Sequence, residues 1–393
     1  MDLPRRYGIA MRGPPEPLTA KDLLRRFLAP AIFVALIFSV YFRAKTDNAG
    51  ADVVGSGAAD AEPDARQAPA PPPERDVVVL EGSTMGTTFS VQVVGELDSD
   101  AQAALASAVQ VELAKVDEQM STWRDDSELS RFNRHAETTP FAVSPETRAV
   151  VVDAVRVFGA TDGAFDPTVG PLVQAWGFGG GVTPGAPLTE QEVAPLLSHV
   201  GLGKIRVDRE ENTLTKSDPD VELDLSAIAK GWGVDRVHRA VRALGHTDTM
   251  VEIGGEVRVS GRNARGARWR LGIERPDAER GTVQQVVHLD DDSIATSGDY
   301  RNYVERGGER WSHTIDPRTG RPIEHGLASV TVIADHCTTA DAWATALNVL
   351  GPEAGLVAAD AQGLKALFLI RSGAGFTVVR SAALDASDRL TGP

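Results

Sequence analysis

The sequence predicts an α+β protein with mixed, largely antiparallel sheets, flanking helices and two lobes. The chain has 393 residues, of which 42% are hydrophobic and 24% charged, as in folded globular proteins. Strand and helix signals alternate irregularly along it, without the regular βαβ spacing of a doubly wound parallel sheet. Short turn segments separate most of the strand signals, which is typical of antiparallel hairpins.

The first 76 residues differ from the rest. Residues 1–45 carry eight basic and three acidic side chains, although the whole chain has a net charge of -15. Residues 27–42 contain no charged side chain, and Arg25 and Arg26 come directly before them. This pattern predicts a cytoplasmic basic segment at 1–26, a transmembrane signal anchor at 27–42, an Ala/Pro-rich linker at 43–76 and the folded body at 77–393.

Two alternatives to the anchor remain, a cleaved signal peptide and a buried core helix. No small-residue A-x-A-like cleavage site ends the apolar stretch, which favours a retained anchor. Positive charge on its N-terminal side predicts a single-pass protein of the inner membrane with the body on the periplasmic side.

Periodicity and turn residues give the elements of the body in order. Helices are predicted over 99–120, 145–161 and 337–351. Strands are predicted over 77–80, 89–94, 222–225, 250–253, 257–260, 269–274, 283–289, 300–306, 310–315 and 328–334. We expect a hairpin across Arg306 and Glu309.

Charge and cysteine content exclude several classes of protein. An acidic chain does not provide the broad basic surface that binds nucleic acid. Cys337 is the single cysteine, which rules out an internal disulfide and any zinc site built on two thiolates.

The helix predicted over 337–351 carries candidate metal ligands. Asp341 and Thr345 are four residues apart and therefore lie on one helix face. A carboxylate and a hydroxyl so placed can give two oxygens to Mg²⁺. Alternatively, Thr338 to Asp341 is a variant capping box in which the acid faces backbone amides of its own helix.

Two further segments carry polar residues at turns. Around Ala227 the pattern changes from strand alternation to helix periodicity, and Lys230 with Gly231 permits close approach of a phosphate. His313 ends a predicted strand as a candidate base, with Asp316 as its orienter; an ordinary Asp-Pro turn explains Asp316 equally well.

The residues and the order of eight sequence blocks resemble those of the FAD:protein FMN transferases, the ApbE-type flavin transferases, from about residue 80 to residue 370. The blocks are MGTT from Met85, MSTWRDDSELSRFN from Met120, GAFDPTVGPL from Gly163, DLSAIAKG from Asp224, IGG from Ile253, SIATSG from Ser293, HTIDPRTG from His313 and TADAWATA from Thr339.

The resemblance implies a bilobal ApbE-like fold, Mg²⁺, and FAD as the substrate. It implies transfer of the FMN moiety to a Thr or Ser hydroxyl in a D-x-x-[ST]-G-A-[ST] motif of an acceptor protein, with release of AMP. The FAD contacts it implies are Met85, Trp123, Ala164, Phe165, Asp166, Asp224, Lys230 and Ile315, and the metal ligands are the Ala227 carbonyl, Asp341 and Thr345.

The chain departs from relatives at three of these blocks. Trp123 replaces a tyrosine and keeps an aromatic stacking surface, whereas Lys230 and Ala344 replace acids near the implied metal.

Two rival functions use the same residues: an FAD pyrophosphatase giving FMN and AMP, and a non-catalytic FAD-binding protein. The acceptor motif does not occur in this chain, so the expected acceptor is another protein.

Overall fold

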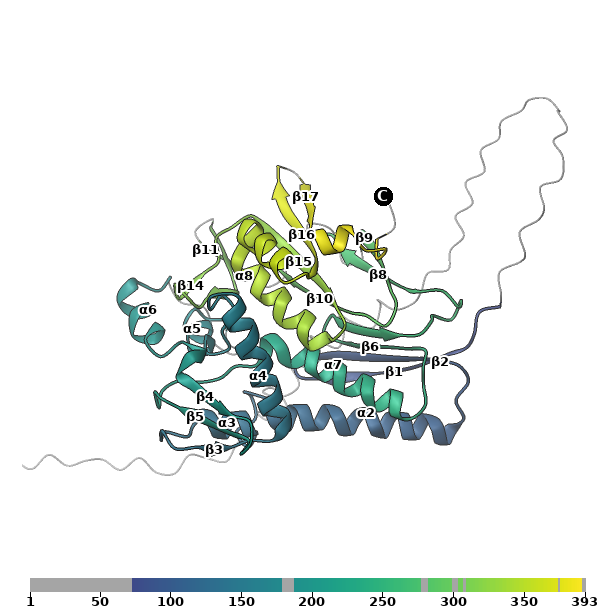
Figure 1. Ribbon diagram of the computed structural model, residues 1–393, viewed down its shortest axis with the longest axis horizontal. Coiled ribbons are helices and arrows are strands. Elements are labelled where there is room, and N and C mark those ends of the chain that lie inside the picture. The colour runs from purple at the N-terminus through teal and green to yellow at the C-terminus, as the bar shows by residue number, and fades with distance from the viewer. Residues whose placement is uncertain are drawn as a thin grey trace, which may run out of the picture. The chain divides into compact units, whose positions relative to one another are not determined.

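The computed structural model describes residues 73–178, 187–276, 282–298, 303–306, 309–373 and 375–390 (Figure 1). The predicted segments 1–26 and 27–42, and nearly all of the linker 43–76, lie outside these residues. Among the helices of the described part, none combines the length and apolar character that a membrane crossing requires.

The largest sheet of the described residues has eight strands. In spatial order they are β1 (Val77–Thr84), β2 (Thr87–Val94), β6 (Thr249–Ile253), β7 (Glu256–Ser260), β10 (Ser293–Gly298), β15 (Leu327–Ala334), β16 (Lys365–Ser372) and β17 (Gly375–Arg380). Each neighbouring pair is antiparallel, which confirms the predicted sheet type.

Helices cover one face of this sheet. They are α2 (Ser99–Met120), α7 (Ser226–Ala243) and α8 (Cys337–Ala361). In β6, Val251 and Ile253 face α2 and α7, whereas Met250, the residue before Val251, faces the opposite side. This alternation buries both faces of the sheet, because successive strand side chains point in opposite directions.

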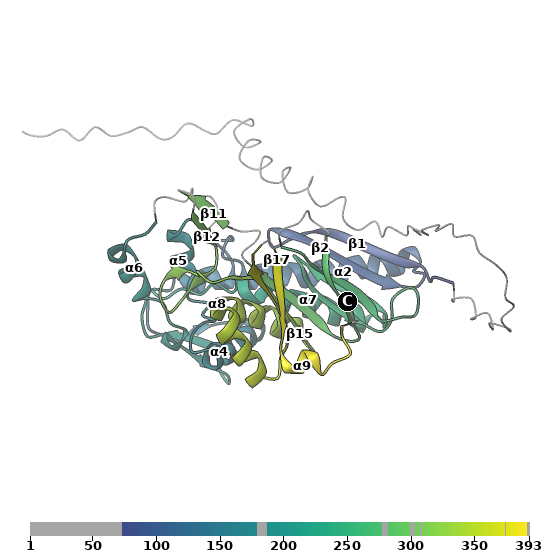
Figure 2. The same cartoon turned by 90° about the horizontal axis from the view of Figure 1, so that it is seen from above.

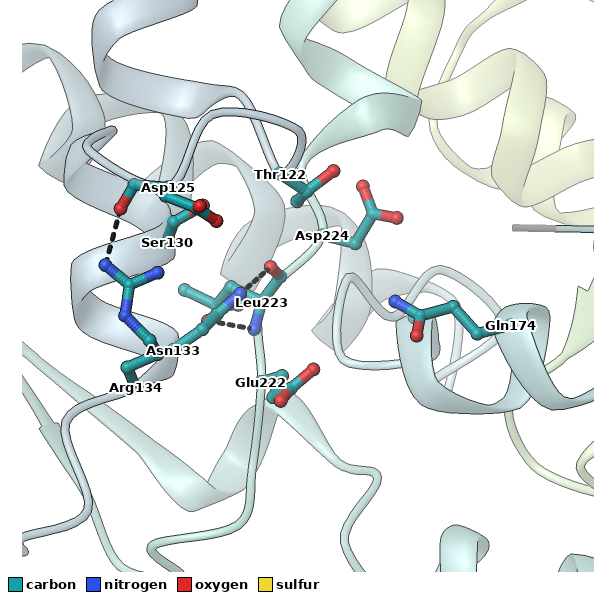
Figure 3. Close-up of a pocket in the computed structure, with 10 residues that line it drawn as sticks. Thr122, Asp125, Ser130, Asn133, Arg134, Gln174, Glu222, Leu223 and Asp224 are labelled. Carbon is teal, nitrogen blue, oxygen red and sulfur yellow. Dashed lines mark hydrogen bonds between the residues drawn. The ribbon is translucent and has the colours of Figure 1, made fainter. Parts of the chain in front are cut away.

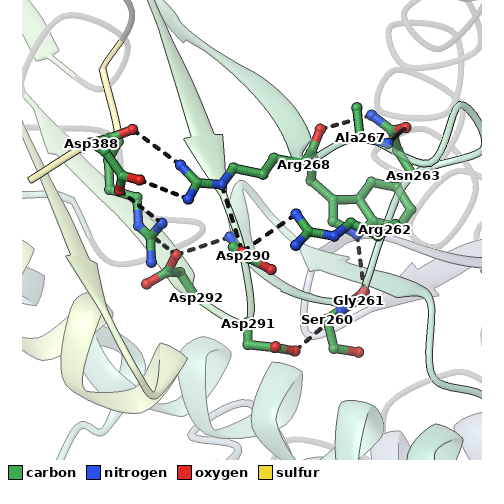
Figure 4. A network of polar contacts seen from close by, with 12 residues as sticks. Ser260, Gly261, Arg262, Asn263, Ala267, Arg268, Asp290, Asp291, Asp292 and Asp388 are labelled. Atoms are coloured by element: carbon green, nitrogen blue, oxygen red, sulfur yellow. Dashed lines mark hydrogen bonds and ion pairs between the residues drawn. The ribbon is translucent and has the colours of Figure 1, made fainter.

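The opposite face packs on β8 (Trp269–Glu274), β9 (Val283–Leu289) and the C-terminal helix α9 (Ala382–Asp385). A polar network joins this region to the end of the chain (Figure 4). Arg268 forms ion pairs with Asp388 at 2.7 Å and with Asp290 at 3.6 Å, and Arg389 pairs with the buried Asp292 at 2.8 Å.

The remaining elements lie largely beside α4, toward one end of the described body (Figures 1 and 2). They are α3 (Glu128–Asn133), β3 (Phe141–Ala142), α4 (Pro145–Ala160), α5 (Gly170–Ala175), α6 (Glu190–Leu197), the 3₁₀ turn η1 (Leu202–Lys204), β4 (Ile205–Asp208), β5 (Thr213–Lys216), β11 (Tyr303–Arg306), β12 (Glu309–Ser312), β13 (Ile315–Asp316) and β14 (Arg321–Pro322). The predicted hairpin is confirmed by the pairing of Arg306 with Glu309.

The two lobes predicted from the sequence do not separate in the structure. The described residues belong to one compact unit. Helix α8 explains this, since it contacts both α4 and the strands β10 and β15. Its residues Ala340 and Trp343 belong to the same hydrophobic core as Val150 of α4.

One other prediction was wrong, and a further one was confirmed. Residues 222–225 form no strand, because the Asn133 side chain takes the place of a neighbouring strand. Its amide donates to the Leu223 carbonyl at 2.8 Å and its oxygen accepts from the Leu223 amide at 2.8 Å. The helix predicted over 337–351 was expected to end at Gly351, and this is confirmed: Gly351 has a non-helical backbone with φ 78°, and a second helical stretch of α8 begins at Pro352, a residue suited to a first helical turn.

Candidate functional site

The first turns of α7 and α8 meet at a close crossing. Gly231 of α7 has no Cβ, and a Cβ there would lie 2.4 Å from the Cys337 carbonyl oxygen of α8. The Gly231 amide donates to Asp341 Oδ2 at 2.9 Å. In a regular helix that amide points at the Ala227 carbonyl four residues earlier. The carbonyl of Ala227 and the carboxylate of Asp341 therefore converge on one backbone amide.

This contact decides between the two interpretations of Asp341. The acid does not cap its own helix, because its hydrogen bond goes to α7. The capping-box alternative is therefore wrong. Thr345, one turn further along α8, approaches Ser297 of β10, with 3.3 Å between the hydroxyl oxygens.

Lys230 lies between two buried acids at this crossing. Its Nζ is 3.6 Å from Asp341 Oδ1 and 3.5 Å from Glu256 Oε1. Glu256, the first residue of β7, is 5% exposed, and its Oε2 has no hydrogen-bond partner among the described residues. Burial raises the pKa of Glu256 while Lys230 opposes the shift. Burial alone would lower the pKa of Lys230, but the charges of Asp341 and Glu256 raise it.

Two glycine-containing hairpin turns pack beside this cluster. Met85 and Gly86, which join β1 to β2, both have positive φ, as the tight two-residue turn of a hairpin requires. The Met85 methyl group lies against α7, 2.9 Å from where a Cβ at Gly233 would stand. A Cβ at Gly254, in the next hairpin, would meet Lys230 Cδ at 3.2 Å. Met85 and Lys230 thus join Ala227, Asp341 and Thr345 in one region.

A polar pocket of about 180 Å³ opens at the start of α7 (Figure 3). Its lining residues are Thr122, Asp125, Ser130, Asn133, Arg134, Gly170, Gln174, Glu222, Leu223 and Asp224. The Asp224 carboxylate lies between Thr122 and Gln174 in this view, and it also accepts from the Ser226 amide at 2.9 Å. Lys230 Nζ reaches the Ser226 carbonyl at 3.5 Å. Pocket and charged cluster are therefore one helical turn apart.

The other predicted FAD contacts fall into two groups. Trp123 follows the pocket residue Thr122 and is 77% exposed, so its ring is available for stacking. Ala164 and Phe165 are buried, and Asp166 is held by Thr168 and by the Leu202 amide at 3.0 Å. Burial raises the pKa of Asp166 against these hydrogen bonds. The side chains of this second group point into the core, which leaves their backbone for ligand contacts.

His313 lies between β12 and β13, and its ring stands edge-on to Phe178 with 6.5 Å between centroids. The next residue, Thr314, accepts from Asn348 of α8 at 3.2 Å. Asn348 is seven residues after Asp341 and therefore lies on the same face of α8. Ile315 is buried against Trp176 and its neighbours.

Asp316 does not orient His313. Its carboxylate is bound by the Arg318 guanidinium at 2.9 and 2.8 Å and by the Arg318 amide at 2.9 Å. The Asp-Pro turn is therefore the correct interpretation of this residue.

Known proteins are similar to this chain over most of its length. The ApbE family model matches residues 85–368. This chain belongs to the ApbE family. It is 45% identical over 299 residues to a protein of Vibrio cholerae named FAD:protein FMN transferase, covering 76% of this chain and 89% of that protein. A protein of the same name from Haemophilus influenzae is 42% identical over 316 residues, covering 79% and 91%.

Solved structures of the ApbE family share the fold. The flavin transferase ApbE from Vibrio cholerae aligns with a TM-score of 0.72 at 42% identity, covering 79% of this chain and 99% of that one. The α+β class, with antiparallel sheets and flanking helices, is confirmed by this similarity and by the strand pairing described above.

Sequence reasoning missed several residues of this candidate site. Glu256 directly follows the Ile253-Gly-Gly255 block, and that position was the available signal. Asp235 lies four residues after Gly231, on the α7 face that meets α8. The pocket residues Gln174 and Glu222 gave no local signal, because segments distant in sequence bring them together.

A second acidic group lies away from the predicted ligands. His199, Asp218 and Asp220 place potential ligand atoms within 4.8 Å of one another. Lys204 Nζ is already 3.1 Å from Asp218 Oδ2, and His199 Nδ1 is 2.9 Å from the same oxygen. Because these two basic groups already contact that oxygen, the cluster is a poorer candidate for a cation than the crossing of α7 and α8.

Proposed function

We propose that this chain transfers the FMN moiety of FAD to a Thr or Ser hydroxyl of an acceptor protein, with Mg²⁺ and with release of AMP. The observation that carries the proposal is the hydrogen bond from the Gly231 amide of α7 to the Asp341 carboxylate of α8, one helical turn from a polar pocket. Relatives that match about three quarters of the chain are named for this transfer.

The donor set of the crossing fits Mg²⁺. Asp341 is 3% exposed, and together with Glu256 it places two enclosed carboxyl groups beside the single ammonium of Lys230. Glu256 Oε2 has no hydrogen-bond partner among the described residues, so one buried oxygen of this cluster is open to a further partner. Asp341, Thr345 and the Ala227 carbonyl would hold the ion through the oxygen ligands that it prefers. Bound there, Mg²⁺ would neutralise charge that develops on the pyrophosphate.

The chain's own residues would bind and orient FAD around this point. The polar pocket with Asp224 and Gln174 holds one end of the dinucleotide, and the exposed Trp123 ring stacks on an aromatic ring of FAD. Lys230 supplies positive charge beside the first turn of α7, where amides at a helix N-terminus also favour phosphate.

His313 is the proposed general base. A ring nitrogen takes the proton of the acceptor hydroxyl as the oxygen attacks the phosphorus of the FMN moiety. The bond between that phosphorus and the bridging oxygen breaks, and AMP leaves with the bridging oxygen. The products are an FMN–protein phosphoester and AMP. The proton of the acceptor hydroxyl passes to His313 and from there to solvent.

The experiment incubates the protein with FAD, Mg²⁺ and a purified protein carrying the D-x-x-[ST]-G-A-[ST] motif. In-gel flavin fluorescence should appear on the acceptor, and chelation of the metal should remove it. An acceptor variant with Ala in place of the final Thr or Ser of the motif is the control. Release of FMN and AMP with no labelled acceptor would instead identify a pyrophosphatase, and FAD binding without turnover would identify a binding protein.

We also propose that residues 27–42 anchor the protein in the inner membrane with the folded body on the periplasmic side. The proposal rests on the uncharged stretch and the basic residues before it, which lie outside the described residues. Protease added to intact spheroplasts should degrade the body. Protection of the body until the membrane is lysed would contradict this orientation.

A further inference from the structure

Asp235 of α7 binds the start of α8. It is 5% exposed, and its carboxylate accepts from the Thr338 amide at 2.9 Å, the Thr338 hydroxyl at 2.6 Å and the Cys337 amide at 3.1 Å. Arg258 of β7 also donates to it. The first residues of α8 are thus held by an acid from another helix.

This arrangement replaces the usual local cap. The N-cap residue of α8, His336, makes no side-chain capping hydrogen bond. The first amides of a helix have no partners within it, so an acceptor must come from elsewhere. Here that acceptor is anchored on α7, and it therefore fixes where α8 begins relative to α7.

A second contact runs in the opposite direction. Asp341 of α8 accepts from the Gly231 amide of α7 at 2.9 Å. Gly231 and Asp235 are four residues apart and lie on the same face of α7. Each helix thus supplies one carboxylate to backbone amides of the other. The missing Cβ of Gly231 permits the close approach, since it would stand 2.4 Å from the Cys337 carbonyl oxygen.

We propose that Asp235 is a positioning residue for the metal site: by holding the start of α8 against α7, it keeps Asp341 opposite the Ala227 carbonyl. The inference rests on the proposed function, because it requires that these two residues bind the ion. Asp235 itself is already occupied by four donors and supplies no ligand. Its effect is on the distance between two ligands carried by different helices.

The test measures metal affinity separately from turnover. Mn²⁺ is added in the presence of FAD, and the free ion is followed by electron paramagnetic resonance with FAD alone subtracted. Asp235→Ala should weaken Mn²⁺ binding by about 10- to 100-fold, the range found when groups that orient metal ligands are removed. Asp235→Asn, which keeps an acceptor oxygen for the amides, should fall between Asp235→Ala and the wild type.

Kinetics and hydrogen exchange provide two further readouts. The Mg²⁺ concentration for half-maximal flavinylation should rise in Asp235→Ala, while kcat at saturating Mg²⁺ recovers most of its wild-type value. The Cys337 and Thr338 amides should exchange faster in the same variant. A residue that only stabilises the fold would lower the melting temperature without moving the Mg²⁺ midpoint.

Asp292→Asn is the matched control. Asp292 is 3% exposed and pairs with Arg389 at 2.8 Å in the polar network of Figure 4, none of whose labelled residues belongs to α7 or α8. It should lower the melting temperature and leave Mn²⁺ affinity unchanged. If Asp235→Ala does not fold, Thr338→Val removes only the hydroxyl donor at 2.6 Å, and it should weaken Mn²⁺ binding measurably compared with Thr249→Val, which removes a buried hydroxyl from β6.

Three outcomes decide the proposal. Weaker Mn²⁺ binding in the Asp235 or Thr338 variants, with none in their controls, supports it. Wild-type Mn²⁺ affinity in a folded Asp235→Ala protein overturns the positioning role and leaves the proposed function intact. Absence of Mn²⁺ binding by the wild-type protein with FAD overturns the metal site itself, and the positioning role with it.

Discussion

Replacing Asp341 with asparagine should remove most of the Mg²⁺-dependent transfer by this protein while leaving it folded. Asp341 is 3% exposed and has two neighbours at the crossing, the Gly231 amide at 2.9 Å and Lys230 Nζ at 3.6 Å. Asparagine keeps an oxygen for the amide and loses the negative charge. It leaves Lys230 in place and removes the carboxylate charge that would bind the cation.

The stability cost follows from the hydrogen bond. A bond to a charged acceptor contributes about 1.5–3 kcal/mol, and one to a neutral acceptor about 0.5–1.5 kcal/mol. The free energy of unfolding should therefore fall by about 1–2 kcal/mol, which lowers the melting temperature by roughly 1.5–3 °C in a body of this size.

The catalytic cost is larger. Loss of a group that merely orients a ligand costs about 10- to 100-fold, so loss of the ligand itself should cost at least about 100-fold in transfer at a fixed Mg²⁺ concentration. This corresponds to about 3 kcal/mol in the activation free energy.

The assay titrates Mg²⁺ in a flavinylation reaction and records thermal unfolding with and without Mg²⁺. Binding to the folded state should raise the melting temperature of the wild type and not that of Asp341→Asn. Asp292→Asn serves again as the control for the loss of a buried carboxylate. A folded Asp341→Asn protein with wild-type Mg²⁺ dependence and only a lowered melting temperature would refute the role of Asp341 as a ligand.

Three further predictions concern single residues. His313→Ala should keep FAD and Mg²⁺ binding but lose about 10²- to 10⁴-fold in transfer, measured with FAD in excess; a wild-type rate would exclude it as the base. Trp123→Ala should raise the KM for FAD about 2- to 10-fold with no change in melting temperature, because the ring is 77% exposed. Trp123→Phe keeps an aromatic ring and should have a KM close to that of the wild type; a wild-type KM in Trp123→Ala would exclude stacking. Burial and the charge of Arg258 lower the pKa of His238 to about 4 from 6.5, so the unfolded chain binds a proton first. The free energy of unfolding should then fall by up to about 3 kcal/mol as the pH falls from about 6.5 to about 4. In His238→Gln the urea midpoint should decrease less over this pH range than in the wild type; an equal decrease in both proteins would contradict the assignment.

Local patterns predicted part of the regular structure and missed elements such as β16 and β17. The apolar spacing of residues 99–120 gave the bounds of α2, and turn residues gave the hairpin of β11 and β12. The prediction for 222–225 was wrong because a side chain from residue 133 satisfies that backbone in place of a strand. No pattern within 222–225 carries information about Asn133.

In the candidate site, too, relations within one element could be predicted from the sequence, whereas contacts between elements could not. Asp341 and Thr345 share one helix face, and this spacing is visible in the sequence. Asp235 is about 100 residues from the amides that it binds, and Glu256 meets Lys230 across two different elements. Such pairings depend on how α7, α8 and β7 pack, and local periodicity does not encode that packing.

The most direct test of the proposed transfer is the intact mass of a purified acceptor protein after incubation with this protein, FAD and Mg²⁺, together with the amount of AMP released. The account predicts an acceptor heavier by FMN less one water, with one AMP for each modified acceptor and no change when Mg²⁺ is chelated. An unmodified acceptor in a reaction that converts FAD to free FMN and AMP, or one in which FAD is not consumed, would contradict it.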